Sequence, residues 1–251
     1  MEMRSMDMGS MQGGSAPPDA RDPHAYAGGQ DFGPYHPLHL ADTHNFASLL
    51  ADNFEITRSD DNTAAAYDLQ GWFGRTYNRA VFKAEGDIDG GEIQDARSEL
   101  LWGHAIAPYW DTQFGVRYDS GDGPNRSWLA FGIQGLAPYW FDVEVTGYLG
   151  EDSRTALRVD ASYELLFTQK LVLQPSIEAD VYGKNDRARG LGSGLADLTA
   201  ALRLRYEIRR EFAPYVGVEW AGKFGKTRDL ARAAGEDAND VRVVAGVRFW
   251  F

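Results

Sequence analysis

The chain has 251 residues, no cysteine and a formal net charge of -12, with 25 Lys and Arg against 37 Asp and Glu. This acidic balance argues against a nucleic-acid partner, because a phosphate backbone binds clustered Lys and Arg. No run reaches the roughly 20 apolar residues of a membrane-spanning helix. No apolar signal-peptide core stands at the start, so we expect that any export leader precedes this numbering.

Residues 1–44 are predicted to be a flexible tail. All five methionines lie within the first eleven residues, and four of the five histidines lie before residue 45. The segment is rich in Gly, Pro, Ser and Asp and lacks periodicity, so it cannot bury enough apolar surface to offset its ordering entropy.

This tail is a candidate copper site. Methionine thioethers suit Cu(I), and imidazoles suit Cu(II). A tail has no core that methionine could fill, so packing does not explain these residues. The spacing of His36, His39 and His44 permits a shared ion but is not a diagnostic motif, and ordinary loop histidines are the alternative. The predicted copper ligands are Met6, Met8, Met11, His24, His36, His39 and His44.

From about residue 45 onward the hydrophobic pattern has a period of two, which is typical of β-strands. We predict an all-β fold, a transmembrane antiparallel up-and-down β-barrel of about 12 strands that covers residues 45–251. A soluble β-sandwich or barrel is the alternative. The predicted strands are residues 45–58, 63–75, 78–88, 94–107, 108–120, 125–136, 138–150, 154–168, 170–183, 195–210, 213–225 and 239–251.

A weak repeat indicates the orientation. The segments Ala107-Pro108-Tyr109, Ala137-Pro138-Tyr139 and Ala213-Pro214-Tyr215 each follow an even-numbered strand, so these short turns lie at one end. The longer polar segments 87–94, 184–194 and 226–238 lie at the other end. Outer-membrane barrels have short periplasmic turns and longer outer loops. We therefore expect a barrel in the lipid of a bacterial outer membrane, with both termini in the periplasm.

Aromatic residues are expected to form a girdle at the periplasmic interface. The last strand alternates in this way up to its terminal residue. One face carries Val241, Val243 and Phe249, and the other carries Arg242 and Arg248. The girdle is predicted to contain Tyr109, Trp110, Tyr139, Trp140, Tyr215, Trp250 and Phe251.

The polar faces of the strands carry both charges. Pairing across strands would fill the lumen, whereas the acidic excess favours a path for cations. The candidate cation path consists of Asp68, Glu85, Glu99, Asp111, Asp119, Asp142, Glu144, Asp160, Glu178 and Asp180. Glu164, Asp197, Glu207 and Glu219 are also expected to face inward, with Lys83, Arg97, Arg117, Arg158, Arg203, Arg205, Arg209, Lys223, Arg242 and Arg248 as the basic residues.

Several blocks in order resemble the copper-resistance protein B family of outer-membrane proteins. They are residues 8–14 (MGSMQGG), 23–26 (PHAY), 99–104 (ELLWGH), 115–119 (GVRYD), 135–140 (GLAPYW) and 205–215 (RYEIRREFAPY). The resemblance implies an outer-membrane barrel that works beside a periplasmic multicopper oxidase and helps to sequester or expel copper. We therefore expect a non-enzymatic, monomeric protein with copper, as Cu(I) or Cu(II), as its bound or transported ion.

Two other functions are compatible with a barrel. One is a general porin. The other is a barrel phospholipase, because Ser98 and His104 share the outward face of one strand. These two residues are six positions apart, about 20 Å at the usual rise of a strand, which is beyond hydrogen-bonding reach.

Overall fold

The computed structural model describes residues 44–59 and 62–251. The predicted tail therefore lies outside the described residues, except for His44. Among the described residues, no helix has both the length and the apolar character needed to cross a membrane.

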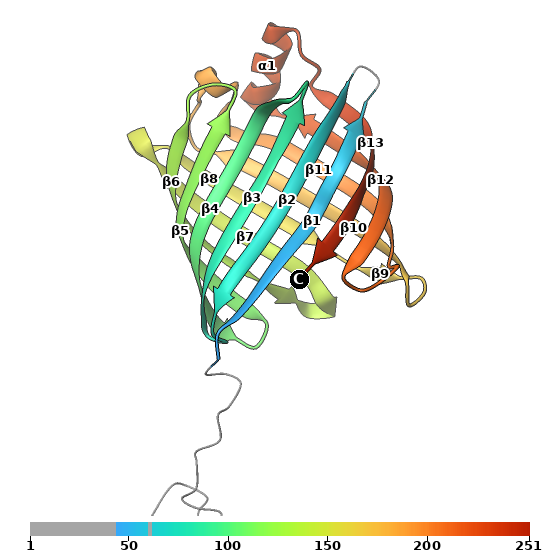
Figure 1. Cartoon of the computed structure of the whole chain (residues 1–251). Coiled ribbons are helices and arrows are strands. Elements are labelled where there is room, and N and C mark those ends of the chain that lie inside the picture. Colours follow the sequence, from blue (N-terminus) through green and yellow to red (C-terminus); the bar gives the residue numbers. More distant parts are fainter. Residues whose placement is uncertain (1–43, 60–61) are drawn as a thin grey trace, which may run out of the picture. The chain divides into compact units, whose positions relative to one another are not determined.

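The described chain consists almost wholly of antiparallel strands (Figure 1). The strands are β1 (Phe46–Arg58), β2 (Thr63–Gly74), β3 (Asn78–Asp89), β4 (Glu92–Ala107), β5 (Trp110–Gly121), β6 (Arg126–Ala137), β7 (Phe141–Gly150), β8 (Thr155–Ser162), β9 (Leu165–Leu166), β10 (Leu171–Tyr182), β11 (Gly194–Tyr206), β12 (Phe212–Lys223) and β13 (Asn239–Trp250). Each strand pairs with its neighbours in sequence, except that β8 and β9 both pair with β10, so the fold is an up-and-down meander.

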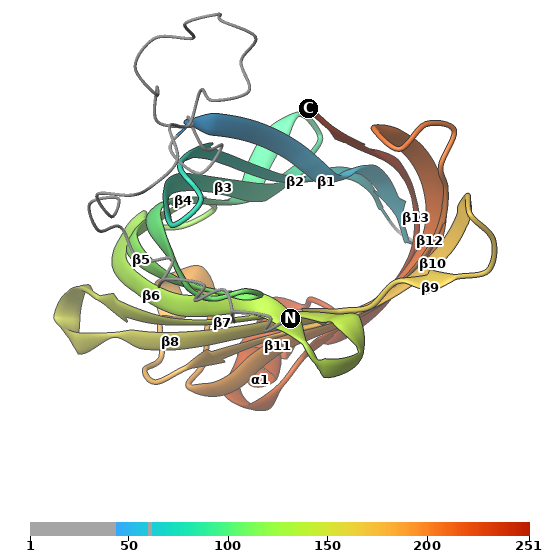
Figure 2. The ribbon, with the colours of Figure 1, turned by 90° about the horizontal axis from the view of Figure 1, so that it is seen from below.

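The meander closes on itself because β1 pairs with β13 as well as with β2. β9 is a two-residue continuation of β8 along β10, so the barrel has twelve strand positions. Figure 2 shows the closed ring of strands from below. Closure gives each of the twelve strand positions two partners and satisfies the backbone N–H and C=O groups, which hydrocarbon cannot do. The prediction of a twelve-stranded transmembrane barrel is confirmed.

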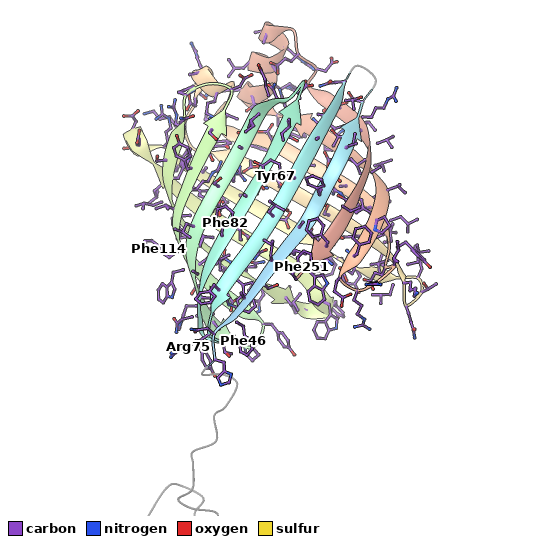
Figure 3. The ribbon with its side chains drawn as sticks, in the orientation of Figure 1. Phe46, Tyr67, Arg75, Phe82, Phe114 and Phe251 are labelled. Atoms are coloured by element: carbon purple, nitrogen blue, oxygen red, sulfur yellow. The ribbon has the colours of Figure 1, made fainter. Side chains whose placement is uncertain are left out.

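Side chains alternate between an apolar exterior and a polar interior. In β5, Phe114, Val116 and Tyr118 are 56, 50 and 47% exposed, whereas Gln113, Arg117 and Asp119, on the opposite face, are buried. Figure 3 shows Phe82 and Phe114 on the outer surface. A soluble sandwich would bury its apolar face in a core, so this alternative is wrong.

The two ends of the barrel differ, as predicted. We call the end with the starts of β1, β3 and β5 the turn end, where every connection is short and both ends of the barrel chain lie. At the opposite end, the loop end, the longest connections are residues 183–193 and 224–238. The second of these contains the helix α1 (Gly225–Ala234), which the strand pattern did not predict.

Three other details differ from the prediction. Segment 87–94 is not a long loop, because β3 and β4 run on to a tight turn at Gly90 and Gly91, where both residues have positive φ. The strand predicted at 154–168 breaks after Ser162 and resumes as β9. The strand predicted at 195–210 already ends at Tyr206.

The aromatic girdle is only partly as predicted. Tyr109, Tyr139, Trp140 and Phe251 are strongly exposed at the turn end, whereas Tyr215 is 5% exposed. The Tyr215 hydroxyl points inward and donates a hydrogen bond of 2.8 Å to Glu55. Placing Tyr215 in the girdle was wrong, because it shares the inward parity of Glu219 on β12.

The loop of residues 183–193 is attached to its neighbours by polar contacts. Arg126 donates two hydrogen bonds to Asp186, of 2.7 and 3.1 Å, and Arg189 lies 2.8 Å from Asp95. The Thr227 hydroxyl on α1 accepts a hydrogen bond from the backbone of Gly192, where a Cβ atom would lie 2.4 Å from the Thr227 nitrogen. The loop and α1 therefore pack as one unit at the loop end.

Replacing Phe114 with Arg should reduce the stability of the membrane-inserted barrel by about 2–4 kcal/mol if the position lies near the bilayer centre. The cause is a charge placed against hydrocarbon. Urea unfolding in lipid vesicles, followed by the gel migration of unheated samples, measures the change. Phe114→Leu is the control and should change little. Equal stability of the Arg and Leu variants would contradict the lipid-facing assignment.

Replacing Asp186 with Asn should destabilise the barrel at neutral pH by about 1.5–3 kcal/mol, the range for a hydrogen bond to a charged group. The hydrogen bond from Arg126 lowers the pKa of Asp186 below its usual range, and the charges of Arg126 and Arg154 add to this. The difference in unfolding free energy between wild type and variant should be fully present above about pH 4, which is the pKa of an aspartate in the unfolded chain. It should vanish as the pH falls through the lower pKa of Asp186 in the folded protein.

Urea titrations of both proteins at neutral and acidic pH check this dependence. Asp152→Asn is the matched control, because Asp152 pairs with Arg154 but its side chain is 73% exposed. A difference in unfolding free energy between wild type and Asp186→Asn that stays constant at all pH values would contradict a stabilising role for the Asp186 charge.

Candidate functional site

The barrel encloses a lumen of about 1460 Å³. Its lining includes Leu50 and Arg248 near the turn end and Lys223 and Asn239 near the loop end, so the cavity extends along the length of the barrel. Alternate residues of each strand point into this lumen, and most of the charged side chains of the strands are among them.

One part of the lumen is filled by a packed cluster. Arg117 lies 4.4 Å from the ring centroid of Tyr148 and 5.7 Å from that of Trp128. Asp119 accepts hydrogen bonds from Arg117 and from the Trp128 indole, at 2.6 and 2.8 Å. Glu99 accepts one of 2.8 Å from the Tyr148 hydroxyl. All five residues are buried, which fits a filler that stiffens the wall.

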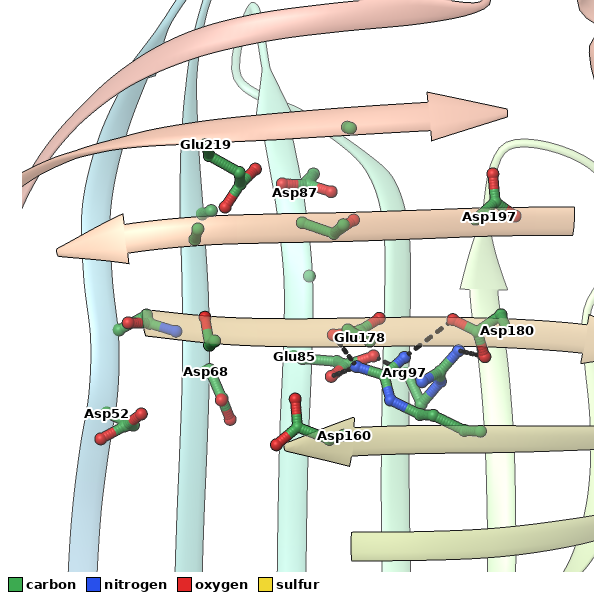
Figure 4. Close-up of a pocket in the computed structure, with 18 of the residues that line it drawn as sticks. Asp52, Asp68, Glu85, Asp87, Arg97, Asp160, Glu178, Asp180, Asp197 and Glu219 are labelled. Carbon is green, nitrogen blue, oxygen red and sulfur yellow. Dashed lines mark hydrogen bonds and ion pairs between the residues drawn. The ribbon is translucent and has the colours of Figure 1, made fainter. Parts of the chain in front are cut away.

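A second group, the mid-lumen cluster, consists of Glu85, Arg97, Arg158, Glu178 and Asp180. Arg158 on β8 lies 2.8 Å from Glu85 on β3, so the cluster connects strands that are not neighbours in the barrel. Arg97 on β4 also lies 2.8 Å from Glu85. Figure 4 shows Glu85, Glu178 and Asp180 gathered around Arg97.

Other lumen charges are also paired. Lys83 donates hydrogen bonds to Gln113 and Glu144. Arg203 lies 2.7 Å from Glu55 and 3.0 Å from Glu219. The expected pairing of charges across strands is therefore present.

Five aspartates on the lining strands have no ion pair or side-chain hydrogen bond within the described part of the chain. All five line the cavity and keep access to solvent. Four of them are labelled in Figure 4 around the mid-lumen cluster. These unpaired aspartates are Asp68, Asp87, Asp142, Asp160 and Asp197. Their negative charge is not compensated locally, so it favours cations in the lumen.

The ten predicted acidic residues thus divide into two sets. Asp68, Asp142 and Asp160 are unpaired, and the other seven have polar partners. Asp111 lines a smaller cavity of about 240 Å³ and pairs with Arg79 at 2.6 Å. Asp87 was missed because it lies where the predicted strand 78–88 overlaps the polar segment 87–94, which was expected to be a loop, although it continues the inward parity of Lys83 and Glu85.

Of the predicted copper ligands, only His44 lies in the described part of the chain. It is exposed directly before β1, with its ring 6.4 Å from that of Phe46. Met6, Met8, Met11, His24, His36 and His39 lie outside the described residues. Within residues 44–59 and 62–251, no group of three or more His, Asp or Glu side chains could hold a metal ion.

His104 faces outward on β4, beside the ring of Trp102. Its Nδ1 lies 3.0 Å from the Asn78 side-chain oxygen, which also accepts a hydrogen bond from Trp102. The polar partner of His104 is therefore Asn78. This contact fits an interfacial polar residue.

Comparison with a known structure shows the same type of fold. The NanC porin aligns with a TM-score of 0.52 at 10% identity, covering 81% of this chain and 99% of the porin. At this identity the likeness concerns the fold alone, a barrel of the outer-membrane class.

Sequence comparison gives the family. The chain is 45% identical over 203 residues to Copper resistance protein B of Escherichia coli, covering 81% of this chain and 69% of that protein. The Copper resistance protein B homolog of Pseudomonas syringae pv. tomato matches with the same identity and coverage. The family model for the Copper resistance protein B precursor (CopB) matches residues 45–251. The chain belongs to the copper resistance protein B family.

Proposed function

We propose that this chain serves copper resistance at the outer membrane without catalysing a reaction. Copper binds to the predicted ligands of residues 1–44, and the acidic lumen assists its passage or holds it at the membrane. The observation that carries the proposal is the set of unpaired aspartates in a barrel whose relatives are named copper resistance proteins.

The two regions suit different oxidation states of copper. Thioethers are soft ligands that prefer Cu(I), whereas carboxylates and imidazoles accept Cu(II). The lumen offers carboxylates and no sulfur, because all five methionines precede residue 12. In this proposal the methionines bind Cu(I), and the lumen admits Cu(II).

The orientation in the membrane is part of the same proposal. Both ends of the barrel chain lie at the turn end, and outer-membrane barrels place their short turns in the periplasm. The copper-binding segment is then periplasmic. A soluble multicopper oxidase would exchange copper with it there, and the barrel would act as a monomer.

Deleting residues 1–44 should abolish tight copper binding, as measured by isothermal titration with Cu(I) and with Cu(II). Replacing Met6, Met8 and Met11 with Leu should lower the Cu(I) affinity by at least about tenfold, or about 1.4 kcal/mol. The thioether ligands are lost while the side-chain size is kept. Replacing the four predicted histidines with Gln should instead lower the Cu(II) affinity. Unchanged affinity after deletion would remove this segment from the mechanism.

Replacing Asp68 and Asp160 with Asn should reduce Cu(II) entry into liposomes that contain the barrel by roughly tenfold, because the local field that concentrates cations is weakened. A copper-sensitive dye inside the liposomes reports the flux. Asp229→Asn removes the same charge from α1, outside the lumen lining, and should leave the flux unchanged.

The same liposomes separate this function from that of a general porin. Rapid passage of uncharged sugars, with a copper flux that does not respond to Asp68→Asn and Asp160→Asn, would favour the porin. Absence of any copper flux would restrict the protein to storage or docking at the membrane.

A further inference from the structure

Two distant parts of the barrel wall touch each other through the lumen. Glu85 on β3 and Arg97 on β4 are register partners, and so are Arg158 on β8 and Asp180 on β10. Each part of the wall therefore presents one acidic and one basic side chain next to each other. Arg158 lies 2.8 Å from Glu85, and Arg97 lies 3.7 Å from Asp180. We call these four residues the lumen bridge.

The two parts of the wall that the bridge joins are almost opposite in the ring. From β3, the strand β8 is reached in five steps through β4, β5, β6 and β7, and in seven steps the other way round. A circular ring of twelve strands, spaced by about 4.8 Å and tilted by about 40°, would be roughly 24 Å across. One arginine and one glutamate side chain do not span that width.

The two walls are therefore drawn together at the bridge. Figure 2 shows an elongated ring, with β2 and β3 on one long side and β7 and β8 on the other. The bridge crosses the short dimension of this ring, so it divides the lumen into two sides.

The two sides of the bridge differ in content. Toward β5, β6 and β7, the lumen is filled by Arg117, Trp128 and Tyr148, which are 3, 5 and 2% exposed. Toward β11, β12, β13, β1 and β2, the cavity is lined by two of the unpaired aspartates, Asp68 and Asp197. A passing ion therefore has a packed side closed to it and an acidic side beside the bridge.

The bridge is built to resist separation of the walls. Each of its four charges contacts two charges of the opposite sign, because Arg97 also pairs with Glu85 and Arg158 also pairs with Asp180. Arg97, Arg158 and Asp180 have side chains that are only 12, 15 and 9% exposed, so salt screens these pairs weakly. Moving the walls apart would leave charges without partners in a site of low polarity, which is costly.

We propose that the lumen bridge is the size filter of this barrel. It holds two opposite walls together, so that organic solutes are excluded while small cations pass on the acidic side. Glu85 and Arg158 are then the residues that determine the size limit, because their contact spans the lumen. The passage of cations rests on the proposed function, whereas the exclusion of organic solutes does not.

The test is the uptake of uncharged sugars into liposomes that contain the full chain, measured by the rate of osmotic swelling in a pentose, a hexose and a disaccharide. The wild type should admit none of them faster than liposomes without protein. Replacing Glu85 and Arg158 together with Ser keeps the net charge and removes the contact through the lumen. Pentose uptake should then rise by at least about tenfold, and uptake should decrease with the size of the sugar.

Replacing Asp52 and Arg248 together with Ser is the matched control. This pair also lines the lumen and also removes one charge of each sign, but it joins the neighbouring strands β1 and β13. Its sugar uptake should equal that of the wild type. Equal uptake by the wild type and the Glu85 and Arg158 variant would overturn the proposal, as would an equal rise in the control.

Unheated gel migration verifies that each variant is folded. If the variant with Ser at both positions of the bridge does not fold, Glu85→Gln with Arg158→Gln replaces it. Glutamine keeps polar side chains in the lumen but removes the attraction between the charges, so pentose uptake should still exceed that of the wild type. Equal uptake would again overturn the proposal.

The sugar measurement is independent of copper. A bridge variant that admits sugars, together with a wild type that passes no copper, would contradict the proposed function and leave the size filter standing. Rapid sugar uptake by the wild type, together with a copper flux that responds to Asp68→Asn and Asp160→Asn, would overturn the size filter alone.

Discussion

The absence of water in the hydrocarbon of a membrane is the constraint on which this structure depends. Each backbone N–H and C=O group there needs a partner within the protein, and a sheet meets this need only when it closes. The pairing of β1 with β13 provides that closure. Since side chains alternate along a strand, closure also directs one face of every strand to lipid and the other into the lumen. The lumen charges are a consequence of this geometry.

Burying those charges has an energetic cost that determines how the lumen is organised. Charges removed from water are stable only when paired or hydrogen-bonded. Arg117 and its aromatic neighbours meet this condition by close packing, and the mid-lumen cluster meets it by sharing guanidinium groups among carboxylates. The unpaired aspartates remain because they keep access to the solvent of the cavity. The pairing of charges therefore accounts for most of the lumen residues, and the proposed cation path concerns the unpaired aspartates of the same wall.

The departures from the predicted fold have local causes. The helix α1 lies in a polar connection, where a period-two pattern gives no signal and packing on residues 183–193 supplies the stability. β9 is separated from β8 because Pro175 on β10 stands opposite Tyr163 in the register and has no N–H to donate, although its carbonyl accepts a hydrogen bond from the Tyr163 nitrogen. Tyr215 was placed by its position next to a turn motif, whereas the alternation along β12 decides its direction. The alternation of residues along a strand predicted the direction of this side chain better than its distance from a turn motif.

By itself, the sequence determined the barrel, the approximate limits of nearly every strand and the face on which most charged side chains lie, because these depend on a local period of two. Glu207 and Arg209 are exceptions, because β11 ends before them. Only the tertiary structure decided which carboxylates have a cation and which do not. Glu85 and Arg158 are 73 residues apart in sequence. Their contact arises from the closed ring, which brings β3 and β8 to the same level of one narrow lumen. A local sequence pattern cannot indicate a contact between residues so far apart in the chain.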